Sequence, residues 1–288
     1  MRDFTLKMFA LLVDSLKRED YSFLTYEESL SRQGGRFVIL RHDVDRSLLN
    51  ALRMARLERR MGIAGSYYFR EGIRGRSTEV IREIVRLGHE AGYHYENLSA
   101  EGGDMEAAIA SFRRELAFFR QFYPVTTICM HGSPLSKHDN RLLWVQNDYR
   151  DHQILAEPYF DLDITDTLYI SDTGRRWDGD ASIRDRSGMG SVMKGLPGWD
   201  KWAVAVPEKS MIRIKPGCGA LHELYSFRGT EDIMAELAAG RLPERIMINI
   251  HPQRWDDNYL KWFRELVSQN IKNDVKRIML NKRDSIKR

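Results

Sequence analysis

The chain has 288 residues, with 45 Lys and Arg against 41 Asp and Glu and a formal net charge of +4. Hydrophobic residues make up 42% and charged residues 30%, which is typical of a globular protein and excludes a disordered, fibrous or membrane-spanning one. The positive excess is too small and too dispersed for the basic stripe of a nucleic-acid-binding protein. The two cysteines, Cys129 and Cys218, are too few for a disulfide scaffold or a multi-cysteine zinc site.

The N-terminal segment from Asp3 to Leu16 has apolar residues at helical spacing, interrupted by charged residues such as Lys7 and Asp14. This pattern predicts an amphipathic helix and lacks the continuous apolar run of a signal peptide. No stretch approaches the ~20 apolar residues that a membrane helix needs. We therefore expect a cytoplasmic protein without a membrane span, whose substrate is not an assembled extracellular polymer.

Short apolar runs alternate with helical segments along the rest of the chain. Buried strands are predicted at residues 36–40, 64–69, 90–94, 125–130 and 246–250. Helical periodicity covers residues 48–61, 78–87, 104–122 and 258–278. Residues 148–225 are less regular, and we expect later strands with long loops there. This order is typical of a parallel sheet or barrel with helices outside it.

The fold class that follows is α/β: a single-domain, irregular, TIM-like (β/α) barrel of about seven strands. We expect residues 1–35 to be a helical extension packed on the barrel, residues 36–280 to form the barrel, and residues 281–288 to be a frayed polar tail.

Polar residues recur just after the predicted strands. They are Arg41, His42, Asp43, Asp45, His94, Glu96, His131 and His251. In (β/α) barrels the carboxyl ends of the strands converge on one mouth, where active sites are built. Residues as distant in sequence as Asp43 and His251 can therefore meet around one substrate.

Asp43 and Asp45 lie two residues apart, so an extended backbone points both carboxylates to the same side. Two carboxylates this close repel unless a cation or a proton lies between them. A metal ion resolves the repulsion if one carboxylate binds it and the other acts as a base beside its water. The alternative is an Asp turn, or an N-cap for the helix that begins near Ser47.

The histidines are less specific as single residues. His94 and His131, each taken alone, are as compatible with a structural role as with metal binding. His251 closes an apolar strand, and an imidazole there can act as an acid or a base near neutral pH.

Taken together, four segments resemble the polysaccharide deacetylase (NodB-homology) superfamily, whose members are metal-dependent N- or O-deacetylases on an irregular (β/α) barrel. The segments are residues 41–45, 88–94, 131–134 and 248–252. They occur in the family's order and span most of the chain. The run Gly88-His-Glu-Ala-Gly-Tyr-His94 directly after a helix is the most specific of the four.

The resemblance implies that Asp43 is the catalytic base and that His251 is the acid that protonates the leaving amine. It also implies that Asp45 and His94 bind a divalent metal, with zinc expected. Candidate substrate-binding residues are Arg41, Arg175, Trp177, Asp178 and Arg254, because arginines can bind phosphates, a tryptophan can stack on a sugar, and the segment around Trp177 flanks the site in the family.

The sequence departs from the family at Leu98, where members usually have the second metal histidine. Leucine cannot bind a cation, so the usual Asp/His/His set is incomplete. We favour His131 as the replacement, because it closes the next predicted strand. Glu96 is a second candidate, and an altered centre without a tight metal site is a third possibility.

We therefore expect a deacetylase-like hydrolase of non-peptide carbon–nitrogen bonds that acts on an N-acylated sugar. The expected substrate is an intracellular glycan precursor, linked to a nucleotide or a lipid. One alternative is a catalytically silent barrel that binds a glycan or a partner, as Leu98 favours. The other is a metal-dependent hydrolase of small cyclic amides, because related barrels host that chemistry.

Overall fold

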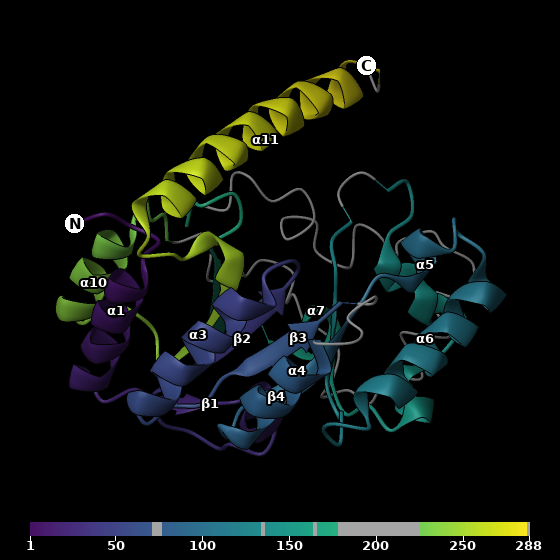
Figure 1. Cartoon of the computed structure of the whole chain (residues 1–288), viewed down its shortest axis with the longest axis horizontal. Coiled ribbons are helices and arrows are strands. Elements are labelled where there is room, and N and C mark those ends of the chain that lie inside the picture. The colour runs from purple at the N-terminus through teal and green to yellow at the C-terminus, as the bar shows by residue number, and fades with distance from the viewer. Residues whose placement is uncertain (71–76, 134–135, 164–165, 178–224, 287–288) are drawn as a thin grey trace.

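The computed structural model describes residues 1–70, 77–133, 136–163, 166–177 and 225–286 (Figure 1). The strands in this part of the chain are β1 (Ser22–Leu24), β2 (Phe37–Val44), β3 (Ser66–Phe69), β4 (Glu90–Tyr95), β5 (Ile128–Met130), β6 (Thr167–Ser171) and β7 (Arg245–Ile250). They form one sheet in the order β5-β4-β3-β2-β7-β6, with β1 beside β2, and every pair is parallel. The sheet is a half-barrel with β5 and β6 at its edges, so the α/β, barrel-like prediction is confirmed.

Helices flank this sheet. The longer ones are α1 (Leu6–Arg18), α3 (Leu48–Arg60), α4 (Ser77–Arg86), α6 (Met105–Phe119), α10 (Thr230–Ala238) and α11 (Tyr259–Ile286). The short ones are α2 (Tyr26–Ser29), α5 (Asn97–Ala100) and α7 (Pro158–Asp161), with 3₁₀ turns η1 (Asn140–Val145), η2 (Tyr149–His152) and η4 (Pro252–Arg254). Figure 1 shows α3 and α4 in front of the sheet, α1 beside α10 at one side, and α6 at the other.

Local sequence signals fix the helix ends. The Ser47 side chain accepts a hydrogen bond from the Asn50 amide at the start of α3. Gly62 follows the end of α3 with a φ of 67°, a left-handed conformation that glycine adopts without strain. The Asp104 side chain caps α6 through the Ala107 amide. These helices lie close to the predicted ranges.

Three parts of the fold differ from the sequence predictions. Residues 1–35 contribute β1 to the sheet as well as helices, because Ser22 to Leu24 pair with Phe37 to Ile39. Helix α10 lies in a segment for which no element was predicted, whereas strand β6 lies within residues 148–225, where later strands were expected without bounds. Helix α11 continues to Ile286, through most of the segment expected to be a frayed tail.

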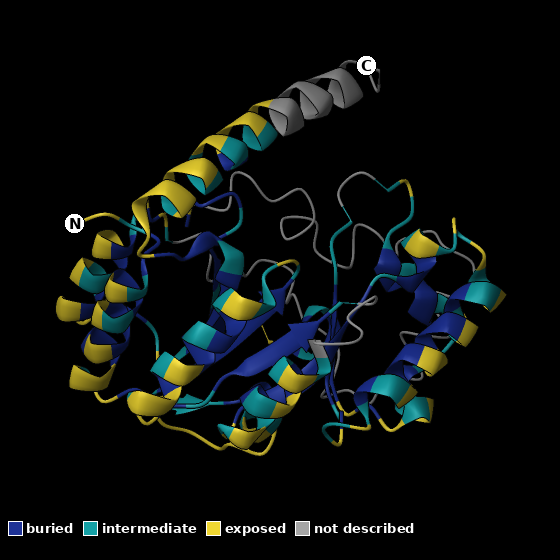
Figure 2. Ribbon diagram, in the orientation of Figure 1, coloured by how far each residue is buried: buried dark blue, intermediate teal, exposed yellow. Residues whose placement is uncertain are grey.

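Alternation along β2 determines which side chains reach the inside of the half-barrel. Val38 and Leu40 belong to a core cluster with α1 and α10, on the outer face of the sheet. Phe37 and Ile39 point the other way, into a separate inner cluster. With a period of two residues, Arg41 and Asp43 share this inner face. Strand β2 is buried along its whole length, as Figure 2 shows for the centre of the sheet.

No helix in the described residues is long and apolar enough to cross a lipid bilayer.

Candidate metal centre and active site

The five residues predicted as catalytic or metal-binding converge at the carboxyl ends of four strands. Asp43 lies in β2 with Asp45 just after it, His94 lies in β4, and His131 and His251 directly follow β5 and β7. Asp45 is at the centre of the group. Its Oδ1 lies 3.6 Å from Nε2 of His94 and 3.6 Å from Nε2 of His131, and its Oδ2 lies 3.8 Å from Nε2 of His251.

The group Asp45, His94 and His131 has the composition and spacing of a metal site. Asp45 Oδ1 is a buried oxygen with no hydrogen-bond partner, between two imidazole nitrogens. Zinc–ligand bonds of about 2.0–2.1 Å in a tetrahedron put the ligand atoms roughly 3.3–3.5 Å apart. The two separations of 3.6 Å are close to this value, so these residues fit a bound divalent ion.

The backbone sets which nitrogen of His94 faces this group. His94 Nδ1 lies 2.9 Å from the carbonyl oxygen of Cys129 in the neighbouring strand, so Nδ1 carries the proton and donates it. Nε2, with its lone pair free, then faces Asp45. Burial lowers the pKa of His94 to about 4, although the nearby carboxylates of Asp43 and Asp45 oppose this shift.

A carboxylate contacts the second imidazole on its far side. His131 Nδ1 lies 2.7 Å from Glu96 Oε2, so Nε2 is the nitrogen left to face Asp45. Ser133 Oγ donates to the same Glu96 oxygen at 3.0 Å, and Arg70 Nε donates to Oε1 at 2.9 Å. Burial alone would raise the pKa of Glu96, but hydrogen bonds and charges from His131 and Arg70 lower it to about 2.

Both candidates for the missing ligand are therefore at the site, in different positions. His131 belongs to the group around Asp45 Oδ1, whereas Glu96 contacts the ring nitrogen of His131 that faces away from Asp45. Leu98 lies in α5 and is 3% exposed, in the hydrophobic core with Tyr95 and Trp144.

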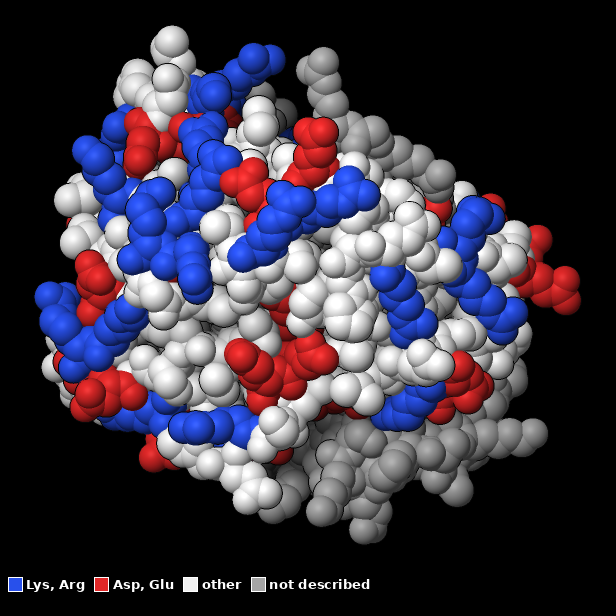
Figure 3. Space-filling view, turned by 60° about the horizontal axis from the view of Figure 1, so that its bottom comes forward, with Lys and Arg blue, Asp and Glu red and all other residues white. Residues whose placement is uncertain are grey.

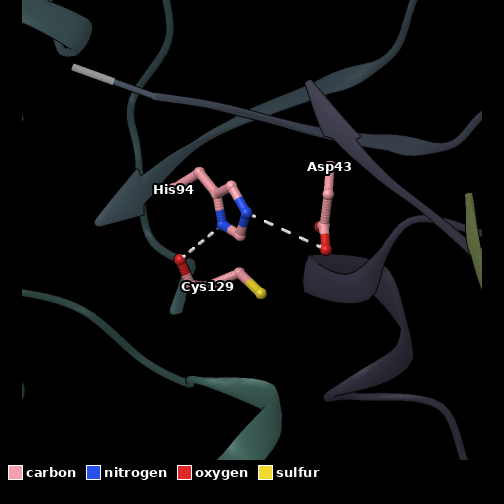
Figure 4. Close-up of side chains that lie close together, drawn as sticks. All are labelled: Asp43, His94 and Cys129. Atoms are coloured by element: carbon pink, nitrogen blue, oxygen red, sulfur yellow. Dashed lines mark hydrogen bonds and ion pairs between the residues drawn. The ribbon is translucent and has the colours of Figure 1, made fainter. Parts of the chain in front are cut away.

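Asp43, His94 and Cys129 form a second group of possible ligands, with the His94 ring between the other two residues (Figure 4). Both oxygens of Asp43 already accept hydrogen bonds. Arg41 donates from Nε to Oδ1 at 3.1 Å and from Nη2 to Oδ2 at 2.8 Å, and Asn249 Nδ2 donates to Oδ2 at 3.0 Å. This second group is thus less available to a metal than the group around Asp45.

Arg41 takes a structural position rather than the predicted substrate-binding one. It is 1% exposed and its guanidinium is paired with Asp43 in the bidentate geometry that favours strong ion pairs. Burial acts to raise the pKa of Asp43, but the charges of Arg41, His94 and His251, together with the hydrogen bond from Arg41, outweigh it and hold this pKa far below its usual value. Asp43 is therefore ionised at any working pH.

His251 is held by an acidic residue that the sequence analysis missed. Its Nδ1 lies 2.6 Å from Asp172 Oδ1, and its backbone amide donates to Asp172 Oδ2 at 2.9 Å. Trp255 Nε1 and Arg254 Nη1 also donate to this carboxylate, at 2.7 and 2.6 Å. Asp172 directly follows β6, as the other polar residues follow their strands. The available signal was the apolar run Leu168 to Ile170 ahead of it.

Three further predicted substrate-binding residues are buried and bonded to other groups of the protein. Arg254 is 8% exposed and its guanidinium is bound to Asp172. Arg175 donates to the carbonyl of Trp262 in α11, and Trp177 is 3% exposed and donates from Nε1 to Thr230.

A turn follows Asp172, in which Gly174 and Arg175 have φ values of 73° and 59°. Asp178 lies outside the described residues.

No family model and no curated protein match the chain. The solved structures that it resembles include carbohydrate esterases and deacetylases of the CE4 family. A CE4 family pseudoenzyme from Bacillus anthracis is 10% identical over 85% of this chain, with a TM-score of 0.38. The chain spans 63% of that pseudoenzyme, which is less than two thirds of its length.

A family 4 carbohydrate esterase from Streptomyces lividans in complex with acetate is 14% identical, over 84% of this chain and 91% of the esterase, with a TM-score of 0.37. A peptidoglycan deacetylase from Bacillus subtilis is 8% identical, over 86% of this chain and 98% of the deacetylase, with a TM-score of 0.36. These likenesses concern the fold alone.

Proposed function

We propose that this chain is a metal-dependent deacetylase that removes the acyl group from an N-acylated sugar by hydrolysing its amide bond. The observation that carries the proposal is the buried, unpartnered Oδ1 of Asp45 between the Nε2 atoms of His94 and His131. Two titratable side chains, Asp43 and His251, flank this oxygen. The sugar substrate rests on the resemblance of the four sequence motifs.

Asp45, His94 and His131 would hold the metal. One carboxylate and two imidazoles are a common ligand set of catalytic zinc, which leaves the fourth position open. When bound, such an ion polarises the acyl carbonyl and lowers the pKa of water. Cys129 and Glu96 orient the two imidazoles through their Nδ1 atoms, which keeps both Nε2 atoms directed at Asp45.

Asp43 would accept the proton of the attacking water. Arg41 and Asn249 fix the orientation of its carboxylate at the inner face of β2. Arg41 contributes to the low pKa of Asp43, so this carboxylate is a weak base. It takes a proton only from a donor whose own pKa is also strongly lowered.

His251 would give a proton to the departing nitrogen from Nε2, the atom on the Asp45 side of its ring. Asp172 contacts Nδ1 and orients the ring, in the way that a buried carboxylate positions the histidine of a catalytic triad. Arg254 and Trp255 neutralise and orient Asp172 in turn.

Metal analysis and deacylation assays on purified protein test this assignment. We expect Asp45→Ala and His94→Ala to lose bound zinc, and Asp43→Asn to retain zinc but lose deacylation. His152→Ala, in η2, is the matched histidine control. The substrate panel contains free, nucleotide-linked and lipid-linked N-acetyl sugars, with small cyclic amides for comparison. Full zinc occupancy in both ligand variants would contradict the metal site.

A catalytically silent barrel that binds a glycan is the second candidate. The observation that favours it is the bidentate ion pair between Arg41 and Asp43, which makes Asp43 a weak base. Zinc binding and N-acetyl sugar binding without turnover of any substrate in the panel would support this candidate over the deacetylase.

A further inference from the structure

The last helix, α11, turns an apolar side away from the body of the protein. Leu260, Phe263, Val267 and Ile271 are 75%, 47%, 42% and 60% exposed. Their spacing of three, four and four residues places them on one face of the helix, which we call the apolar stripe. Figure 2 shows exposed residues along α11, where it projects past the helices that flank the sheet.

The opposite face of α11 attaches the helix to the body. Trp262 Nε1 donates to the carbonyl of Asp3 at 2.7 Å, and the carbonyl of Trp262 accepts from Arg175 at 2.8 Å. About three turns further along the helix, Asn273 donates to the carbonyl of Gly174 at 3.0 Å. A surface helix usually buries its apolar side against the core. Helix α11 does the reverse, so within the described part of the chain the apolar stripe is exposed and can meet a partner.

The charge of the chain is concentrated in the same segment. Residues 259–288 contain nine Lys and Arg and three Asp and Glu, whereas the rest of the chain contains 36 basic and 38 acidic residues. The whole positive excess therefore lies in this C-terminal segment. Lys261 and Arg264, next to the apolar stripe, are exposed. On the face drawn in Figure 3, by contrast, Lys and Arg lie among Asp and Glu.

We propose that α11 docks on an anionic lipid surface, lying in the plane of the interface. The apolar stripe enters the boundary between headgroups and acyl chains, and the flanking Lys and Arg side chains meet the anionic headgroups. Tyr259 and Phe263, at the start of the helix, supply the aromatic side chains that such helices place at this boundary. A second copy of the chain is disfavoured as the occupant, because two segments of the same positive charge repel each other.

Docking in this way orients the candidate site. Helix α11 packs against η4, which directly follows His251. The end of the sheet that carries the site would therefore lie next to the lipid surface, whatever the substrate is.

Vesicle flotation with the full chain tests the proposal. We expect the protein to float with vesicles of equal parts phosphatidylcholine and phosphatidylglycerol, to remain unbound with phosphatidylcholine alone, and to be released by added salt. The double substitution Val267→Ser with Ile271→Ser should weaken flotation by about tenfold or more, because it removes apolar surface from the interface. The double substitution Lys261→Glu with Arg264→Glu should weaken it most at low salt.

Leu49→Ser and Leu155→Ser are matched controls, because these leucines are 67% and 60% exposed outside α11. Both should float like the unsubstituted chain. Circular dichroism should show every variant folded, since all the altered positions are exposed. Absence of flotation, or flotation that the stripe variants leave unchanged, would refute the proposal. So would a dimer in light scattering that only the stripe variants dissociate, since the occupant would then be a second copy.

Discussion

His131 and Glu96 are joined through Nδ1 and Oε2 at 2.7 Å, across the ends of the neighbouring strands β5 and β4. The contact gives the site a second oriented imidazole in a chain where residue 98 is a leucine. Ser133 and Arg70 bind the same carboxylate, so the position of Glu96 is fixed independently of any metal.

Replacing Glu96 by Gln should weaken zinc binding by about 10–100-fold, the usual effect of removing the carboxylate behind a metal-binding histidine. The amide is nearly the same size but neutral, so it lowers the basicity of the His131 ring. Competition with a chelating dye measures the affinity. Glu106→Gln, at an exposed position in α6, is the control. An affinity equal to that of the control would show that Glu96 has no part in metal binding.

Replacing Leu98 by His should not strengthen metal binding, although it restores the residue that the family usually has. Leu98 is packed in the core, and an imidazole without a hydrogen-bond partner there should lower the free energy of unfolding by about 1–3 kcal/mol. Urea denaturation and dye competition measure the two effects. Tighter zinc binding in Leu98→His would instead mean that position 98 can reach the site.

The metal-free protein should lose stability in mild acid because of His94. The folded protein holds the pKa of His94 at about 4, against an ordinary value of 6.5 for histidine. As the pH falls from 6.5 towards 4, the unfolded chain takes up a proton that the folded protein refuses, so stability decreases. The free energy of unfolding decreases by at most about 1.4 kcal/mol for each unit between the two pKa values.

This acid-dependent loss should be smaller in His94→Gln, measured by urea denaturation in the presence of a chelator. The comparison is made above about pH 5, before most carboxylates titrate. Equal losses in the two proteins would rule out His94 as the group responsible.

Replacing Asp172 by Asn should lower the turnover of an N-acylated substrate by about 10²–10⁴-fold while zinc content stays unchanged. The amide removes the carboxylate that orients the His251 ring through Nδ1, but it can still accept the backbone hydrogen bond. Steady-state kinetics and metal analysis check both parts. Loss of zinc together with activity would point to a collapsed site rather than to a missing acid.

The elements that the sequence predicts well are those with strong local signals. Helix α3 has the cap at Ser47 and the glycine at 62, and Asp43 and Asp45 follow an unbroken apolar run. The period of two along β2 then fixes that Asp43 faces the inside of the half-barrel, and Asp45 follows directly after the strand.

The features that sequence reasoning missed depend on contacts distant in sequence. Strand β1 has three residues and is defined by its pairing with β2. Asp172 lies in a stretch with weak periodicity, and its role is defined by His251, 79 residues later. Arg41 was predicted to bind substrate because Asp43, its ion-pair partner two residues away, was considered only as the catalytic base.

Asp3, near the N-terminus, binds two helices from the C-terminal part of the chain. Its carboxylate accepts hydrogen bonds from the amide and hydroxyl of Thr230 at the start of α10, and its carbonyl accepts from Trp262 in α11. The segment before α1 is thus hydrogen-bonded to two later helices. A substitution at Asp3 would loosen the attachment of the first turn of α11. Because α11 is long, a small displacement of that turn would move the far end of the helix by a larger distance.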